Sequence, residues 1–256
     1  MDKIVFIGAG NLATHLSKAL QNVGFDIIQV FSRSESSARA LAETLQTQYT
    51  TEISCIFSDA SLYIVSVSDD AIAPITEKLP LTRQLVVHTA GSMPMEIFAG
   101  KLQNYGVIYP LQTFSKSRPV DFADIPFFLE ANTSENLQQL RYVAEKISDK
   151  VFEAAFAERV QLHLAAVFGC NFVNSLYAVS AEIASQAGFD FGILSSLIFE
   201  TARKAIDSGS PKSVQTGPAV RNDLNVIQKH LHLLASHPDW QNLYTQLSKY
   251  IGETSG

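Results

Sequence analysis

Residues 4–13 read IVFIGAGNLA, an apolar run that leads into a glycine-rich turn. The run is typical of a buried strand, and apolar residues at helical spacing follow over residues 11–23. The turn matches the pattern G-x-G-x-x-G/A between a strand and a helix, which is the context that this pattern requires. The first glycine allows a tight turn, the second lets the backbone approach a pyrophosphate, and Ala13 permits close packing of the helix on the strand. Gly8, Gly10 and Asn11 are expected to hold the pyrophosphate, and Ala9 and Leu12 complete the part of the turn expected to bind the coenzyme. A tight turn without a ligand is the alternative.

Outward from this stretch, strands alternate with helices. Predicted strands lie at residues 27–31, 62–67, 85–88, 106–109, 127–129 and 151–152, and predicted helices at 34–46 and 135–147. This alternation is typical of a parallel sheet covered on both faces. The later part of the chain has only helical patterns, at 158–186, 191–208, 222–236 and 239–250. We therefore expect an α/β protein, with a doubly wound Rossmann domain over residues 1–153 and an all-helical domain over residues 154–256.

Composition and charge exclude several classes of protein. The 256 residues include 19 basic and 25 acidic side chains, so a nucleic-acid binder is not expected. Cys55 and Cys170 lack metal-type spacing, and we expect neither a disulfide framework nor a metal site. The apolar window at 162–187 contains Asn171 and Glu182, which favours a buried helix over a membrane span. The start of the chain does not read as a signal peptide, and we expect a cytoplasmic location.

The end of the second predicted strand bears on the choice of coenzyme. NAD-binding sites usually place Asp or Glu there for the ribose hydroxyls, whereas this chain reads FSRS at residues 31–34. Ser32, Arg33 and Ser34 suit a 2′-phosphate, because a guanidinium pairs with phosphate and stacks on adenine. The stretch favours NADP over NAD, with a solvated arginine in a polar loop as the alternative.

A second segment is expected to flank the coenzyme. The sequence SVSDD at residues 66–70 follows the next clear strand, and ligands of open α/β sheets lie beyond the carboxyl ends of the strands. We expect Val67, Ser68 and Asp69 beside the ribose and nicotinamide, while Asp70 favours the start of the next helix.

The motifs GAGNLA, SRS, VSVSD and HTAGS, in this order, resemble the NADP-binding domain of the 6-phosphogluconate dehydrogenase-like superfamily. That superfamily includes pyrroline-5-carboxylate reductase and deazaflavin-dependent NADP oxidoreductase. The segments AAVF and NFVN within residues 165–174, and TGPAVRND at 216–223, look like a smaller bacterial family of NADP oxidoreductases with a helical C-terminal domain. The resemblance implies an NADP-dependent oxidoreductase that passes hydride to or from a small polar substrate in a cleft between the domains.

The chain departs from the superfamily at one place. Many β-hydroxyacid dehydrogenases carry a catalytic lysine on the first long helix of the second domain, and here His163 stands about where that lysine would be. A histidine can donate or accept a proton near neutral pH. The missing lysine leaves a non-catalytic NADP-binding sensor or regulator as the alternative function.

Four residues are candidates for contact with the substrate. His163 and Asn171 fall on one stripe of a helix, and His88 ends a predicted strand at the ligand edge of the sheet. Arg221, in a loop that opens a helix, would offer a fork to a carboxylate. Each has a structural alternative: a core histidine, an asparagine that bridges helices, a histidine that caps a loop, and an arginine in an interface ion pair. Tyr109 can orient a substrate, although packing between domains is the favoured interpretation. Burial of the long apolar helix favours a homodimer.

Overall fold

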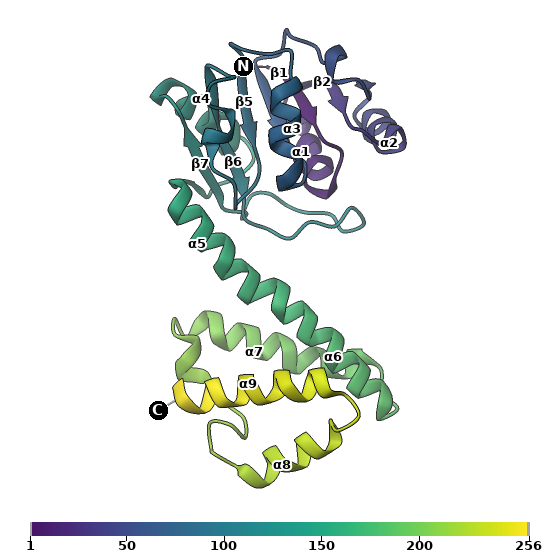
Figure 1. Ribbon diagram of the computed structural model, residues 1–256, viewed down its shortest axis with the longest axis vertical. Helices are drawn as coiled ribbons and strands as arrows, with labels where there is room; N and C mark the ends of the chain where they lie inside the picture. Colours follow the sequence, from purple (N-terminus) through teal and green to yellow (C-terminus); the bar gives the residue numbers. More distant parts are fainter. Residues whose placement is uncertain (1, 255–256) are drawn as a thin grey trace. The chain divides into compact units, whose positions relative to one another are not determined.

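The computed structural model describes residues 2–254, and its internal contacts divide the chain into two compact units, Met1–Asn171 and Phe172–Gly256. The first unit contains the sheet and its covering helices, and the described part of the second is helical (Figure 1). The predicted fold class, an N-terminal Rossmann fold followed by a helical part, is confirmed. The domain boundary at 153/154 follows the last residue of the sheet and stays a prediction, since the division by contacts falls inside the next helix.

One sheet of eight strands organises the first unit, in the order β3-β2-β1-β4-β5-β6-β7-β8. Neighbouring strands are parallel except β6 and β7, which pair antiparallel. The winding reverses between β1 and β4, which is the switch point where open α/β sheets bind ligands. The strands are β1 (Lys3–Ile7), β2 (Asp26–Phe31), β3 (Gln48–Thr50), β4 (Leu62–Val65), β5 (Leu85–His88), β6 (Asn104–Pro110), β7 (Phe127–Ala131) and β8 (Val151–Glu153).

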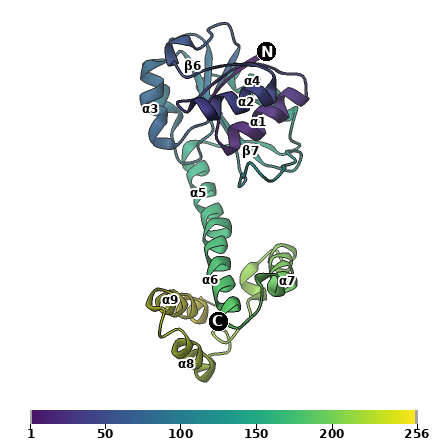
Figure 2. The ribbon, with the colours of Figure 1, turned by 90° about the vertical axis from the view of Figure 1, so that its right-hand side faces the viewer.

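Helices cover both faces of this sheet because successive side chains of a strand point to opposite sides. Ile4 and Phe6 of β1 belong to a buried cluster with residues of α1, α2 and α4, whereas Val5 and Ile7 cluster with residues of α3. Figure 2 shows α3 on one side of the sheet and the other three helices on the opposite side. The helices of the first unit are α1 (Asn11–Asn22), α2 (Glu35–Leu45), α3 (Asp69–Lys78), α4 (Ser134–Glu145) and α5 (Phe156–Ala166).

The long helix predicted at 158–186 contains a π-helical segment. A single helical stretch, Phe156–Gln186, comprises α5, the π segment (Val167–Phe172) and α6 (Val173–Gln186). It is long and apolar enough to cross a membrane by length and composition alone, and none of its most apolar window is buried within the chain. The burial that was expected for the apolar part of this helix is therefore not found within the described residues of the single chain, although Arg159 near its start is buried.

The second unit continues with α7 (Ser195–Asp207), α8 (Leu224–Leu233) and α9 (Pro238–Thr254). None of the described residues 172–254 is buried. Large apolar side chains are instead exposed, including Phe199 at 75%, Ile206 at 79% and Leu233 at 76% of their surface. Amphipathic helices are stabilised mainly by burying an apolar face, and within this chain these faces stay open.

Candidate functional site

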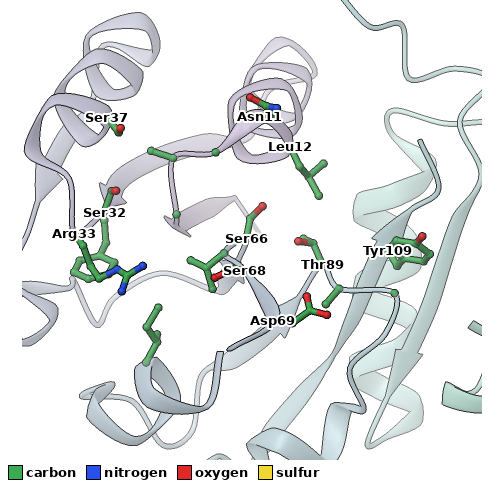
Figure 3. A pocket seen from close by; sticks show the side chains of 18 of the residues that line it. Asn11, Leu12, Ser32, Arg33, Ser37, Ser66, Ser68, Asp69, Thr89 and Tyr109 are labelled. Atoms are coloured by element: carbon green, nitrogen blue, oxygen red, sulfur yellow. The ribbon is translucent and has the colours of Figure 1, made fainter. Parts of the chain in front are cut away.

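A cavity of about 780 Å³ opens beyond the carboxyl ends of the parallel strands, and every residue that lines it belongs to the first unit (Figure 3). It contains all but one of the residues predicted to hold the coenzyme. These are Gly8, Ala9, Gly10, Asn11, Leu12, Ser32, Arg33, Val67, Ser68 and Asp69. Residues far apart in the sequence therefore meet beyond the carboxyl ends of the strands, at the switch point where open α/β sheets bind ligands.

The glycine-rich turn shapes the middle of this cavity. Gly8 has φ +123°, and a Cβ at this position would lie 2.0 Å from the carbonyl oxygen of Ser66, so the turn admits no side chain here. Gly10 is the N-cap residue of α1, and no side chain caps that helix. A Cβ at Gly10 would meet nothing within 4 Å. The start of α1 therefore faces open space with N–H groups that suit an anion.

One end of the cavity is basic and rich in hydroxyl groups. Arg33 has no ion-pair partner among the described residues, and Figure 3 shows it beside Ser32. The nearest carboxylate in sequence, Glu35, is paired with Arg39 at 2.5 Å. Ser34, the predicted residue that does not line the cavity, is the N-cap of α2 and accepts a hydrogen bond from the backbone N–H of Ser37. This end therefore offers a guanidinium that has no ion-pair partner among the described residues.

A tyrosine and a histidine meet at the other end. The Tyr109 hydroxyl, at the end of β6, lies 3.1 Å from Nδ1 of His163 on α5. The edge of one ring also contacts the other. Burial raises the pKa of Tyr109, with a smaller upward contribution from Asp69 that the charge of Arg159 opposes. Tyr109 therefore carries its proton at neutral pH and can donate it to the histidine nitrogen.

A glycine leaves room for the tyrosine ring. A Cβ at Gly91 would lie 2.7 Å from the Tyr109 ring, so this glycine leaves the space that the ring needs. Ser92 donates a hydrogen bond to the Asp69 carboxylate, and both line the cavity with Thr89. The ring of Tyr109 is buried, and its hydroxyl lies at His163 in the cavity wall, so both the packing role and the substrate-orienting role stay predictions.

His88 lies at the end of β5 but does not line the cavity, and its side chain is fully buried. Its Nδ1 accepts a hydrogen bond from the Ala90 backbone N–H at 3.2 Å, and its Nε2 lies 3.3 Å from the Pro94 carbonyl oxygen. Because Nδ1 accepts, Nε2 carries the proton and donates. Burial, and then the charge of Arg159, lowers the pKa of His88 to about 4. Both ring nitrogens thus have backbone partners.

The other two predicted substrate residues are not among those that line this cavity. Asn171 falls in the π segment and is exposed, so the stripe drawn for a regular α-helix does not continue unchanged from His163. Arg221 lies in the second unit, at an exposed turn before α8, whose N-cap is Asp223. No cluster of three or more metal-ligating side chains occurs in the described part of the chain.

Two functional candidates escaped sequence reasoning. Arg159 has no exposed surface and donates to Glu130 at 2.5 Å and to the Met93 carbonyl at 2.8 Å. Glu130 also accepts from the backbone N–H of Phe156, so this pair fixes the start of α5 one turn before His163. No local pattern in α5 distinguished this arginine from the other polar residues of the helix, Glu158, Gln161 and His163. Lys116 lines the cavity from the segment between β6 and β7, where no motif marks it.

The fold and the cavity define a class: proteins with a Rossmann domain that binds a dinucleotide, followed by a helical unit. The model of the family described as NADP oxidoreductase, coenzyme F420-dependent, matches residues 3–91, and a domain of unknown function, DUF2520, matches residues 125–251. A solved structure from Bacteroides fragilis, described as a "putative NADP oxidoreductase", is 49% identical with a TM-score of 0.93, and the match covers 98% of each chain. The chain belongs to this family of NADP oxidoreductase domains joined to DUF2520.

More distant structures share the fold. A protein from Thermotoga maritima is 26% identical with a TM-score of 0.81, over 98% of this chain and 99% of that one. A pyrroline-5-carboxylate reductase from Coxiella burnetii is 18% identical with a TM-score of 0.56, over 98% and 96% of the two chains. The latter likeness shows the fold alone. A comparison with curated proteins gives no match.

Proposed function

We propose that the protein is an NADP-dependent oxidoreductase that transfers hydride to or from a small polar substrate. The observation that carries this proposal is the layout of one cavity, with the unpaired Arg33 at one end, the glycine turn in the middle and the Tyr109–His163 pair at the other end. The family's NADP oxidoreductase domain, matched over residues 3–91, supports the same coenzyme and reaction class.

The residues present fit NADP in three ways. The space at Gly10 and the uncapped start of α1 suit a pyrophosphate. Arg33 and Ser32 suit the 2′-phosphate, since the guanidinium has no ion-pair partner among the described residues. Val67, Ser68 and Asp69 line the wall between the two ends, where the ribose and nicotinamide would lie. When bound, the coenzyme supplies or accepts the hydride.

The protein's own part of the reaction is to orient the substrate and to manage one proton. Tyr109 keeps its proton at neutral pH and lies within hydrogen-bond distance of His163. In the reducing direction, the pair would donate a proton to the oxygen or nitrogen of the substrate, and in the oxidising direction it would accept one. Arg159 holds the start of α5, and therefore His163, against the sheet.

Coenzyme binding tests the first half of the proposal. We expect the wild-type protein to bind NADPH at least tenfold more tightly than NADH in calorimetry, a difference of about 1.4 kcal/mol. Arg33→Ala should lose most of this preference while its affinity for NADH changes little. Failure to bind either reduced coenzyme, or a preference for NADH, would overturn the assignment.

Turnover tests the second half. NADPH oxidation is measured with panels of keto acids, imines and oxidised deazaflavin, for the wild type, His163→Ala and Tyr109→Phe. We expect the two variants to keep their NADPH affinity and to lose about 10²–10⁴-fold in kcat, the range typical of general acid–base groups. Tight binding of NADPH without turnover of any substrate in the panels would favour the non-catalytic sensor. The absence of the superfamily's lysine, with His163 about where it would be, also supports that role.

We further propose that the protein acts as a homodimer in the cytoplasm. Support for the dimer comes from the described helices of the second unit, which lack buried residues and expose Phe199 and Ile206. Large apolar side chains exposed along one face of a helix are typical of an interface. Support for the location comes from Cys55 and Cys170, which are both exposed and free of disulfides.

A further inference from the structure

The segment 111–126, between β6 and β7, is fastened to the start of α1. The Asn11 side-chain amide donates to the carbonyl oxygen of Phe114 at 2.9 Å, and Nε2 of His15 lies 2.8 Å from the carbonyl oxygen of Ser115. His15 also stacks on the Phe114 ring. Phe114 in turn stacks on the buried Phe122, so the segment is tied to the core as well as to the helix.

This attachment places a cation in the wall of the cavity. Lys116 follows directly after the fastened residues and lines the cavity with Asn11 and Leu12 of the helix start. No acidic side chain of the described residues forms an ion pair with Lys116. Arg33 and Lys116 are the only lysine or arginine side chains that line the cavity, and they come from different segments of the described chain.

We propose that Lys116 binds the pyrophosphate of the coenzyme, and that Asn11 and His15 hold the segment 111–126 in position for this contact. The inference rests on the proposed function and adds a phosphate ligand that the glycine motif does not include. A lysine ammonium is a point charge that suits phosphate without bidentate geometry. The pyrophosphate is common to NAD and NADP, whereas the 2′-phosphate belongs to NADP alone. Lys116 therefore contributes affinity, and Arg33 contributes the choice between coenzymes.

This division of roles gives a distinct pattern of binding constants. We expect Lys116→Ala to raise the Kd for NADPH and for NADH by the same factor, about tenfold. Lys116→Arg should restore most of the affinity because it keeps the charge. The affinity of the wild type should fall with rising salt, and that of Lys116→Ala should fall less steeply. Arg118→Ala is the matched control, since Arg118 lies in the same segment and does not line this cavity.

The fastening is tested through a double-variant cycle. His15→Ala should weaken the binding of both coenzymes, and adding His15→Ala to Lys116→Ala should cost little more, because the histidine acts through the lysine. Unchanged Kd values for folded Lys116→Ala, or equal losses in Lys116→Ala and Arg118→Ala, would overturn the inference while the coenzyme assignment stands. A wild type that binds neither coenzyme would instead overturn the proposed function, and this inference with it.

Discussion

His88 illustrates how a strand-end histidine becomes a structural group. Its ring is buried beneath the cavity edge, between the Ala90 N–H and the Pro94 carbonyl, and its neighbour Arg159 carries a permanent charge. A second positive charge there would face both desolvation and repulsion. Burial first and Arg159 second therefore lower the pKa of His88 to about 4.

The lowered pKa predicts a pH dependence of stability. The unfolded histidine takes up a proton as pH falls below about 6.5, while the folded one resists until about 4. The unfolded state therefore binds more protons in this window, and the free energy of unfolding should decrease as pH falls from 6.5 to 4, by about 3 kcal/mol. Denaturant unfolding across this range measures the slope.

A pair of variants isolates the contribution of His88. His88→Gln can keep one backbone hydrogen bond but cannot titrate, so its stability should vary less with pH across this window. His232→Gln, at an exposed position, should keep the wild-type slope. Equal slopes in the wild type and His88→Gln would show that the buried histidine does not cause the effect.

At the scale of elements, the attachment of α5 to the sheet depends on one buried ion pair. Arg159 is fully buried, Glu130 is 16% exposed, and the guanidinium also donates to the Met93 carbonyl. Its Nε has no hydrogen-bond partner. Because both charges have been taken out of water, removal of one leaves the other without compensation.

We expect Arg159→Met to lower the free energy of unfolding by about 3–5 kcal/mol. Arg141→Met is the control, because the Arg141–Glu153 pair is partly exposed and such pairs contribute about 0–1 kcal/mol. Chemical denaturation measures both. The double variant Arg159→Met with Glu130→Gln should recover part of the loss. If Arg159→Met and Arg141→Met cost the same, α5 is not held by this pair.

Elements with a strong local pattern could be predicted, and weak or unusual ones could not. The buried strands and α1, α2 and α4 follow from apolar periodicity. The strand β3 was missed because it has only three residues, none buried, at the edge of the sheet. The π segment was missed because apolar spacing does not reveal a change from i→i+4 to i→i+5 hydrogen bonding.

The candidate site divides in the same way. The part that is predicted to bind the coenzyme is formed by residues at strand ends and helix starts, so Gly8, Gly10 and Arg33 could be proposed from local sequence. The Tyr109–His163 contact joins residues 54 apart, and its distance depends on how β6 and α5 pack. Lys116 lies in an irregular segment whose position is set by Asn11 and His15, and no local pattern encodes such a contact.

At the scale of the whole molecule, the second unit leaves large apolar side chains exposed within the single chain. Phe199 and Ile206 are seven residues apart on α7 and therefore share one face of the helix. Both are more than 70% exposed within the chain. Large apolar patches on a lone protein mark an interface or lead to aggregation. In the proposed homodimer, a second copy of the chain would bury these side chains.

The proposed dimer can be tested by its mass and by a substitution on the apolar face of α7. Sedimentation equilibrium should give twice the chain mass of 28.0 kDa for the wild type. Ile206→Glu places a charge on the apolar face and should raise the dimer dissociation constant by about 10²-fold or more, since a buried unpaired charge costs several kcal/mol. Thr201→Glu adds the same charge to α7 at another exposed position and should stay dimeric. A folded wild type that sediments at 28.0 kDa at all concentrations would contradict the proposal. A dimer that Ile206→Glu leaves unchanged would show that this face of α7 is not the interface.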